Sequence, residues 1–263
     1  MLPLRSIKSL YRLALAEGEG VGTAYEYFAK RMVLRRWLAG CDGARRVLIA
    51  GLPEKYGSSL DFLLIAQELG AAEIVVIDEL EGVLEKNRRS LSAAQAGGDL
   101  TGVKPQYVRV SDLGGLEGIT GVFNLCLGSE VLQRLDPITR QQYVTNLKKL
   151  TMGLALFAPN ADNPNHTNIS GLSGLRLTEL QALLDKAGIP ASVGYIDMPP
   201  FPPGITRSEE QRQQATNGRL EALVMWGLAY YARLERSFPS HWRQHHSHIV
   251  YALNTPHDLD ATR

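Results

Sequence analysis

Short apolar runs alternate with amphipathic stretches along most of this chain, and this alternation restricts the possible folds more than any other feature. The runs are rich in Val, Ile and Leu, as in strands that are buried on both faces of a sheet. Strands are expected at 46–51, 73–78, 106–110, 121–127, 153–158, 191–198 and 248–253. Helices are expected between them, at 58–69, 80–92, 136–150 and 177–188. The alternation predicts an α/β fold, a doubly wound and mostly parallel seven-stranded sheet with helices on both faces.

Helical segments are also expected at both flanks of this alternation. Apolar residues recur at helical spacing through 7–39, and a glycine-rich break at 17–23 divides that stretch into two helices. Residues 207–237 predict one long helix that covers the sheet, acts as a lid or forms a homodimer face. The expected units are a helical cap at 1–40, a domain at 41–254 with a helical insertion at 199–247, and a tail at 255–263.

Charge and cysteine content exclude several classes of protein. The chain has 28 Lys and Arg against 27 Asp and Glu, and this near-neutral balance argues against a nucleic-acid partner and favours a small molecule. Its two cysteines, Cys41 and Cys126, cannot form a disulfide framework or a four-thiolate zinc site. No apolar stretch has the length of a membrane span, so a cytoplasmic location is expected.

The residues that follow the expected strands are the candidates for a binding site, because open parallel sheets bind ligands at the carboxyl ends of their strands. After the first strand, Gly51 and Gly57 bracket a loop that opens a helix, whose free amides favour a carboxylate or a phosphate. Asp78 ends the second strand in a position to accept hydrogen bonds from a ribose. Asp112 follows the third strand, and 126–130 ends the fourth.

Four segments at these strand ends resemble the class I S-adenosylmethionine-dependent methyltransferases. Residues 47–51 with Gly57 resemble the glycine-rich first motif of that family, and 75–78 resembles its ribose-binding strand end. Residues 108–113 resemble the adenine-contact segment, and 123–135 is similar to the fourth strand and the short helix after it. The resemblance covers about 44–200 and implies that the last strand inserts antiparallel beside the sixth. It implies that S-adenosyl-L-methionine contacts Ala50, Gly51, Leu52, Gly57, Ser58, Asp78, Glu79, Asp112, Leu113, Cys126 and Leu127.

The reaction that the resemblance implies is methyl transfer to a small-molecule or natural-product acceptor by in-line attack on the donor methyl. The sulfonium donor is already activated, so alignment and exclusion of water do most of the work. A general base is needed only where the acceptor atom carries a proton. Glu130 and His166 are the candidates for it. The competing interpretations are an acid at the start of a helix for Glu130 and a polar loop histidine for His166.

The sequence departs from the family pattern in the first loop, where five residues that include Pro53 and Glu54 separate the two glycines. Glu54 would repel a donor carboxylate unless Lys55 neutralises it or its side chain turns to solvent. This departure motivates the alternative of a non-catalytic methyltransferase-like protein that binds or scaffolds a partner. A nicotinamide-dependent oxidoreductase is disfavoured because the G-x-G-x-x-G spacing is absent.

Histidines cluster before the last expected strand, at His241, His245, His246 and His248. On a helix, His241 and His245 would share a face and could hold zinc or iron with a third ligand. No cysteine or acid is interleaved, so a solvated loop is expected here, with no metal site.

Overall fold

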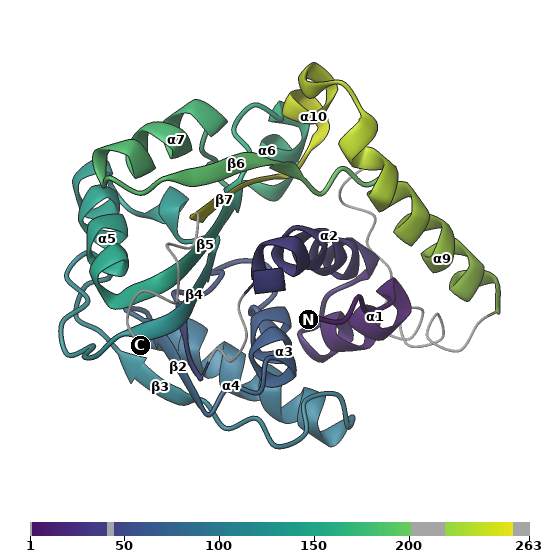
Figure 1. Cartoon of the computed structure of the whole chain (residues 1–263). Helices are drawn as coiled ribbons and strands as arrows, with labels where there is room; N and C mark the ends of the chain where they lie inside the picture. Colours follow the sequence, from purple (N-terminus) through teal and green to yellow (C-terminus); the bar gives the residue numbers. More distant parts are fainter. Residues whose placement is uncertain (1, 41–44, 201–218, 255–263) are drawn as a thin grey trace.

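A computed structural model describes residues 2–40, 45–200 and 219–254 of the chain (Figure 1). The strands form one seven-stranded sheet in the order β3-β2-β1-β4-β5-β7-β6. Their bounds are β1 Arg46–Ala50, β2 Glu73–Asp78, β3 Gln106–Arg109, β4 Phe123–Ser129, β5 Thr151–Pro159, β6 Ala191–Ile196 and β7 Ile249–Asn254. Strand β7 is antiparallel to both β5 and β6, and the other pairings are parallel. The doubly wound sheet and its antiparallel last strand are thus confirmed, and its order reverses between β1 and β4.

Helices cover both faces of the sheet and divide the core in two. On one face lie α1 Ile7–Ala16, α2 Val21–Trp37, α3 Leu60–Glu68, α4 Glu81–Ala96 and α9 Arg219–Leu234. The other face is covered by α5 Pro137–Leu150 and α7 Leu177–Lys186. The shorter helices are η1 Leu38–Gly40, η2 Leu132–Arg134, α6 Pro164–Ser170, η3 Glu235–Ser237 and α10 Ser240–His246. In the described residues no helix has the length and apolarity that crossing a bilayer requires.

The N-terminal helices are built into the core. Helices α1 and α2 pack on each other, and both also contact α9 (Figure 1). The Arg31 side chain of α2 is fully buried, pairs with Glu68 of α3 and donates to the Pro3 carbonyl at 2.8 Å. This charged contact joins α2 to the end of α3, because Glu68 is the last residue of that helix. The expected domain boundaries stay a prediction.

Two helices form where the sequence favours loops. The expected loop around His241 is wrong, because α10 begins directly after Pro239 and places His241 and His245 one turn apart. Helix α6 contains His166, and its start is capped by Asn163, whose Oδ1 accepts from the His166 amide at 3.1 Å. Both helices have seven residues, too few to show an apolar period.

The expected helix at 207–237 is described only from Arg219, and its last three residues form the 3-10 turn η3. Residues 207–218 of that helix, Cys41 and the expected tail lie outside the described residues.

Candidate functional site

Asp78 connects the loops that follow β1 and β4 at the carboxyl edge of the sheet. Its carboxylate is fully buried. Oδ2 accepts from the Leu52 amide at 2.8 Å and from Nη2 of Arg134 at 2.6 Å, and Oδ1 accepts from the Leu80 amide at 2.9 Å. The acid therefore lies where the sequence predicts a ribose contact, but the chain's own Arg134 covers it.

Unpaired polar atoms gather in the segment 130–134, directly after β4. In the described part of the chain, Nε and Nη1 of Arg134, Oε1 of Gln133 and Oε2 of Glu130 are buried without a hydrogen-bond partner. Buried polar groups are normally paired, so each of these atoms needs an explanation. These atoms are two donors and two acceptors within five residues, which suits a ligand that carries both charges.

The glycine loop is also closed by the chain's own side chains. Gly51 has a φ of +79°, and a Cβ built on it would lie 2.4 Å from Cγ2 of Val131. Glycine is required here because the loop after β4 packs directly on the first loop. Glu54 is exposed and Lys55 donates to the Gly171 carbonyl, so Glu54 turns to solvent and stays away from the loop amides.

The start of α3 holds two carboxylates from the connection between α1 and α2. Oε1 of Glu17 accepts from the amides of Ser58 and Leu60 at 3.1 and 2.9 Å and from the Ser58 hydroxyl at 2.7 Å. Oε1 of Glu19 accepts from the Gly57 amide at 2.9 Å. The sequence predicts that this helix start favours an anion, and in the structure Glu17 and Glu19 supply it.

Burial has the largest effect on the pKa of Glu17. It raises the pKa of the carboxyl group to about 7, even though Tyr27, Leu60 and Ser58 all donate hydrogen bonds to it. Glu17 is therefore a partly protonated acid near neutral pH, held at the mouth of the glycine loop.

Glu130 follows β4 directly and is 8% exposed. It has a φ of +57°, and its amide donates to the Phe157 carbonyl at the end of β5. Burial, with repulsion from Glu26, raises the pKa of Glu130 to about 8. Lys30 is also buried, and its Nζ lies 2.5 Å from Glu26 and 2.8 Å from the Ser129 hydroxyl. The charges of α2 thus act directly on the end of β4.

His166 lies in a second polar group, at the ends of β5 and β6. Its ring stacks on His248 with centroids 4.2 Å apart, and burial lowers its pKa to about 3. His248 in turn places Nδ1 3.2 Å from the carboxylate of Asp197, which directly follows β6.

The sequence prediction missed Asp197 as a site residue, although Asp197 directly follows strand β6 in the same way that Asp78 ends strand β2. Arg134, Glu17 and Lys30 were missed because nothing in their own segments marks them.

The remaining predicted contacts fall into two groups. Glu79 accepts from the Leu113 amide at 3.2 Å, and Asp112 caps its own loop by accepting from Gly114 and Gly115. The others, Ala50, Leu127 and Cys126, are fully buried within strands. Cys126 pairs with Leu48 in the sheet interior, and burial raises its thiol pKa far above the ordinary range. The edge therefore brings together Asp78, Glu79, Leu113 and the glycine loop, while Cys126 lies inside the sheet.

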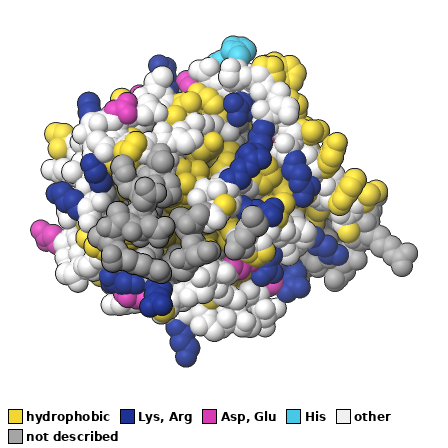
Figure 2. All heavy atoms as spheres, in the orientation of Figure 1, with side chains coloured by type: hydrophobic (Ala, Val, Ile, Leu, Met, Phe, Trp, Pro, Cys, Tyr) yellow, Lys and Arg dark blue, Asp and Glu magenta, His cyan; other side chains and the backbone are white. Residues whose placement is uncertain are grey.

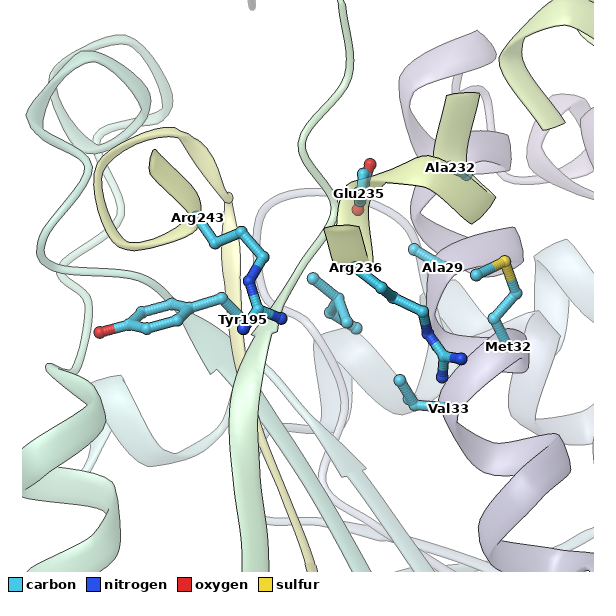
Figure 3. Close-up of a pocket in the computed structure, with 9 residues that line it drawn as sticks. Ala29, Met32, Val33, Tyr195, Ala232, Glu235, Arg236 and Arg243 are labelled. Carbon is cyan, nitrogen blue, oxygen red and sulfur yellow. The ribbon is translucent and has the colours of Figure 1, made fainter. Parts of the chain in front are cut away.

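A small cleft opens elsewhere, between α2, β6 and the end of α9 (Figure 3). Its lining combines apolar side chains of α2 with Tyr195, Glu235, Arg236 and Arg243, and we name it the α2–β6 cleft. None of the predicted site residues lines it. Among the described residues, no group of three or more His, Cys, Asp or Glu could hold a metal ion.

Comparison with known proteins identifies the fold. No family model and no curated protein matches the chain. Among solved structures, a SAM-dependent methyltransferase from Archaeoglobus fulgidus is 14% identical with a TM-score of 0.51, covering 86% of this chain and 94% of that one. The methyltransferase domain of bacterial CtHen1-CN is 13% identical with a TM-score of 0.51, at coverages of 86% and 97%. The [4+2]-cyclase SpnF is 14% identical with a TM-score of 0.51, at coverages of 89% and 81%. Together with the strand order, these matches show that the chain has the fold of the class I S-adenosylmethionine-dependent methyltransferases.

Proposed function

We propose that the chain binds S-adenosyl-L-methionine at the carboxyl ends of β1, β2 and β4 and transfers its methyl group to a small-molecule acceptor. One observation carries the proposal: the unpaired polar atoms of Glu130, Gln133 and Arg134 lie in the segment that closes over the buried carboxylate of Asp78. Solved proteins of the same fold that are named SAM-dependent methyltransferases support the choice of donor.

The polar groups of this edge fit the donor. A ribose diol needs a buried acceptor, which Asp78 offers, and a carboxylate fits the two free N–H groups of Arg134. An ammonium group fits the free oxygen of Gln133. Because Arg134 covers Asp78, the diol can reach that carboxylate only after the Arg134 side chain turns away. When bound, the donor supplies an electrophilic methyl group on a sulfonium.

In the proposed reaction, the chain's own residues position the donor and the acceptor, exclude water and accept a proton. Of the two candidate bases, Glu130 is the stronger one, because its pKa is about 8. Its carboxyl group is mostly protonated at neutral pH, so only the ionised fraction accepts a proton, and that fraction grows as the pH rises toward 8. His166 stays neutral at that pH, but a pKa of about 3 makes it a weak base. We assign proton acceptance from the acceptor atom to Glu130, with Lys30 and Ser129 fixing the end of β4 beside it.

Calorimetric titration with S-adenosylmethionine and with the demethylated product tests the donor site. Wild type should bind both, and Asp78→Asn should weaken binding at least tenfold because the diol loses a charged acceptor, worth about 1.5–3 kcal/mol. Asp185→Asn is the matched control, since it changes an exposed acid of α7. Absence of heat with either ligand at millimolar concentration would remove the proposal.

A second function is favoured by a different observation, the closure of the first loop. Val131 fills the space over Gly51, and Glu17 and Glu19 hold the amides at the start of α3. This arrangement suits a non-catalytic protein that keeps the fold and binds a partner. A protein of this fold that is named a [4+2]-cyclase also shows that the fold alone does not determine methyl transfer. Failure to bind donor and product in the titration above, with an unchanged unfolding curve, would favour this second function.

A further inference from the structure

Charged side chains lie next to one another where β4, β5 and β6 end and β7 begins. The sheet register sets these four strand ends side by side. Glu130 directly follows β4, Asp197 directly follows β6, and His248 directly precedes β7. These residues therefore lie along one stretch of the carboxyl edge, and that stretch begins at β4, which is also the last strand of the proposed donor site.

Helix α2 and the turn η3 bring two more carboxylates to this stretch. Nζ of Lys30 in α2 lies 2.5 Å from the Glu26 carboxylate and donates to the last hydroxyl of β4 at 2.8 Å. Glu235 of η3 accepts from the Tyr25 hydroxyl of α2, and its Oε1 also accepts at 3.0 Å from the amide that follows Asp197. We name these four acids the edge acid group: Glu26, Glu130, Asp197 and Glu235.

The members of the edge acid group act on one another electrostatically. Glu26 repels both Glu130 and Asp197, and Asp197 repels Glu235. Burial, together with this repulsion, raises the pKa of Glu130 to about 8 and that of Glu235 to about 7. With Glu19, which also acts on Glu130, five carboxylates face three basic side chains: Lys30, Lys86 and His248. When all are ionised, this edge has an excess of negative charge.

Two carboxylate oxygens of the edge acid group have no partner in the described part of the chain. They are Oε2 of Glu130 and Oδ1 of Asp197, in residues that are only 8% and 4% exposed. The nearby bases are engaged elsewhere, because Lys30 contacts Glu26 and His248 Nδ1 lies 3.2 Å from the other oxygen of Asp197. Ionised carboxylates only accept hydrogen bonds, so a partner for these oxygens has to bring N–H or O–H donors. Positive charge on that partner would offset the buried negative charge.

We propose that the edge acid group binds an ammonium group, and that the acceptor of the methyl transfer is therefore a primary or secondary amine. The second part rests on the proposed function, whereas the first part stands on the contacts of the group alone. An ammonium group offers N–H donors and a positive charge together. A phosphate or a carboxylate would be repelled, and a neutral hydroxyl would leave the charge uncompensated.

The edge acid group reaches solvent through two of its neighbouring side chains. The Glu26 side chain is 19% exposed and that of His248 is 16% exposed. Figure 2 shows many Lys and Arg side chains and few acidic ones on the face seen in Figure 1. In that view no broad acidic surface competes with the edge acid group for a cation.

The transfer to an amine balances with Glu130 as the proton acceptor. One N–H bond of the ammonium group breaks, and its proton moves to the Glu130 carboxylate. The nitrogen lone pair then forms the bond to the donor methyl, and the electron pair of the broken carbon–sulfur bond stays on sulfur. The products are a methylated ammonium ion and a neutral thioether.

Calorimetric titration with benzylamine at neutral pH tests the ammonium site, with benzyl alcohol as the neutral probe of similar shape. Both probes are titrated at constant ionic strength into the full chain, alone and with the demethylated product bound. Wild type should bind benzylamine roughly tenfold or more tightly than benzyl alcohol. Because the cation ionises Glu130, whose pKa is about 8, binding should release about one proton. The difference between the heats in phosphate and in HEPES buffer measures that release.

Substitutions locate the site. Glu130→Gln and Asp197→Asn should each weaken benzylamine binding about tenfold and leave benzyl alcohol unaffected. Glu26→Gln should weaken it as well, and it removes a partly exposed acid, so it serves if a buried substitution prevents folding. Asp185→Asn, which changes an exposed acid of α7, is the control and should bind as wild type does.

The outcomes separate this inference from the proposed function. Equal affinity for amine and alcohol overturns the ammonium site, as does wild-type affinity in folded Glu130→Gln and Asp197→Asn variants. If the demethylated product binds and benzylamine does not, the amine acceptor is wrong and methyl transfer to another acceptor stands. If benzylamine binds and the product does not, methyl transfer fails and the ammonium site stands as a binding site.

Discussion

Replacing Glu17 by glutamine should change how the stability of the chain depends on pH. The Glu17 carboxyl group is buried, and it joins the α1–α2 connection to the start of α3 through the Ser58 and Leu60 amides. A glutamine has the same shape: its carbonyl oxygen can accept from those amides, and its NH2 group can donate to the Tyr27 hydroxyl oxygen. The substitution therefore keeps the contacts and removes the titration.

The magnitude follows from the pKa of Glu17, which burial raises from 4.5 to about 7. The folded chain holds the Glu17 proton more tightly than the unfolded chain does, so this group's stabilising contribution is complete below pH 4.5 and is lost as pH rises through 7. At 1.36 kcal/mol for each pH unit between the two values, the loss is about 3 kcal/mol. The glutamine side chain of the Glu17→Gln variant has no proton to lose in this range, so the variant should gain about 3 kcal/mol relative to wild type between about pH 4 and pH 8.

Urea unfolding followed by tryptophan fluorescence, repeated across this pH range, measures the difference. Wild type and the Glu17→Gln variant should unfold with nearly the same free energy at about pH 4, and the variant should be the more stable chain at about pH 8. Glu54→Gln, which changes an exposed glutamate of the first loop, is the control and should follow the wild-type curve. A constant difference between variant and wild type at every pH would refute the assignment of a buried, titrating Glu17.

Three further substitutions test the carboxyl edge by the same unfolding measurement. Arg134→Met leaves the buried Asp78 carboxylate with only two amide donors, and it should cost about 3 kcal/mol; an unchanged stability would mean that the ion pair is absent in solution. Tyr143→Phe removes the hydroxyl that donates to the Ala50 carbonyl at 2.6 Å, and it should cost about 1 kcal/mol, with a gain in stability arguing against that bond. Gly51→Ala combines a φ of +79° with a Cβ that would lie 2.4 Å from Val131, and should cost about 2–4 kcal/mol. Gly82→Ala, at an open position in α4, is its control and should be neutral or stabilising.

Most of the sheet is predictable because its strands are continuous apolar runs. The run at 73–78 is predicted and found with the same bounds, since both faces of β2 are covered and the four positions from Ile74 to Ile77 are all apolar. The antiparallel direction of β7 cannot be predicted in this way, because an apolar run indicates a strand without indicating the direction of that strand in the sheet. That prediction came from the family resemblance. Helices α6 and α10 were missed because a helix of two turns depends on its cap more than on an apolar period.

From the sequence, only those residues of the candidate site that directly end or follow a strand can be predicted. Asp78 is found because an acid that terminates an apolar strand has few structural uses, and the same rule applied to Asp197 would have found it too. The partners of these acids cannot be found this way. Arg134 is 56 positions from Asp78, and Glu17 is 41 positions from Ser58. Such pairs form only when the sheet order and the packing of α2 bring distant segments together.

Charged side chains are partly exposed at the amino edge of the sheet and buried at the carboxyl edge, and this difference bears on the position of a functional site. At the amino edge, Arg46 and Glu73 pair with their side chains 33% and 41% exposed, an arrangement that water supports. At the carboxyl edge, Asp78, Glu130 and Asp197 are buried, and burial raises the pKa of the last two. Apolar residues in these places would give a more stable edge, because buried ion pairs seldom repay their desolvation. Stability therefore does not explain this edge, and the ligand site that we propose at the carboxyl ends of the strands would account for it. The donor titration is accordingly the first experiment to perform.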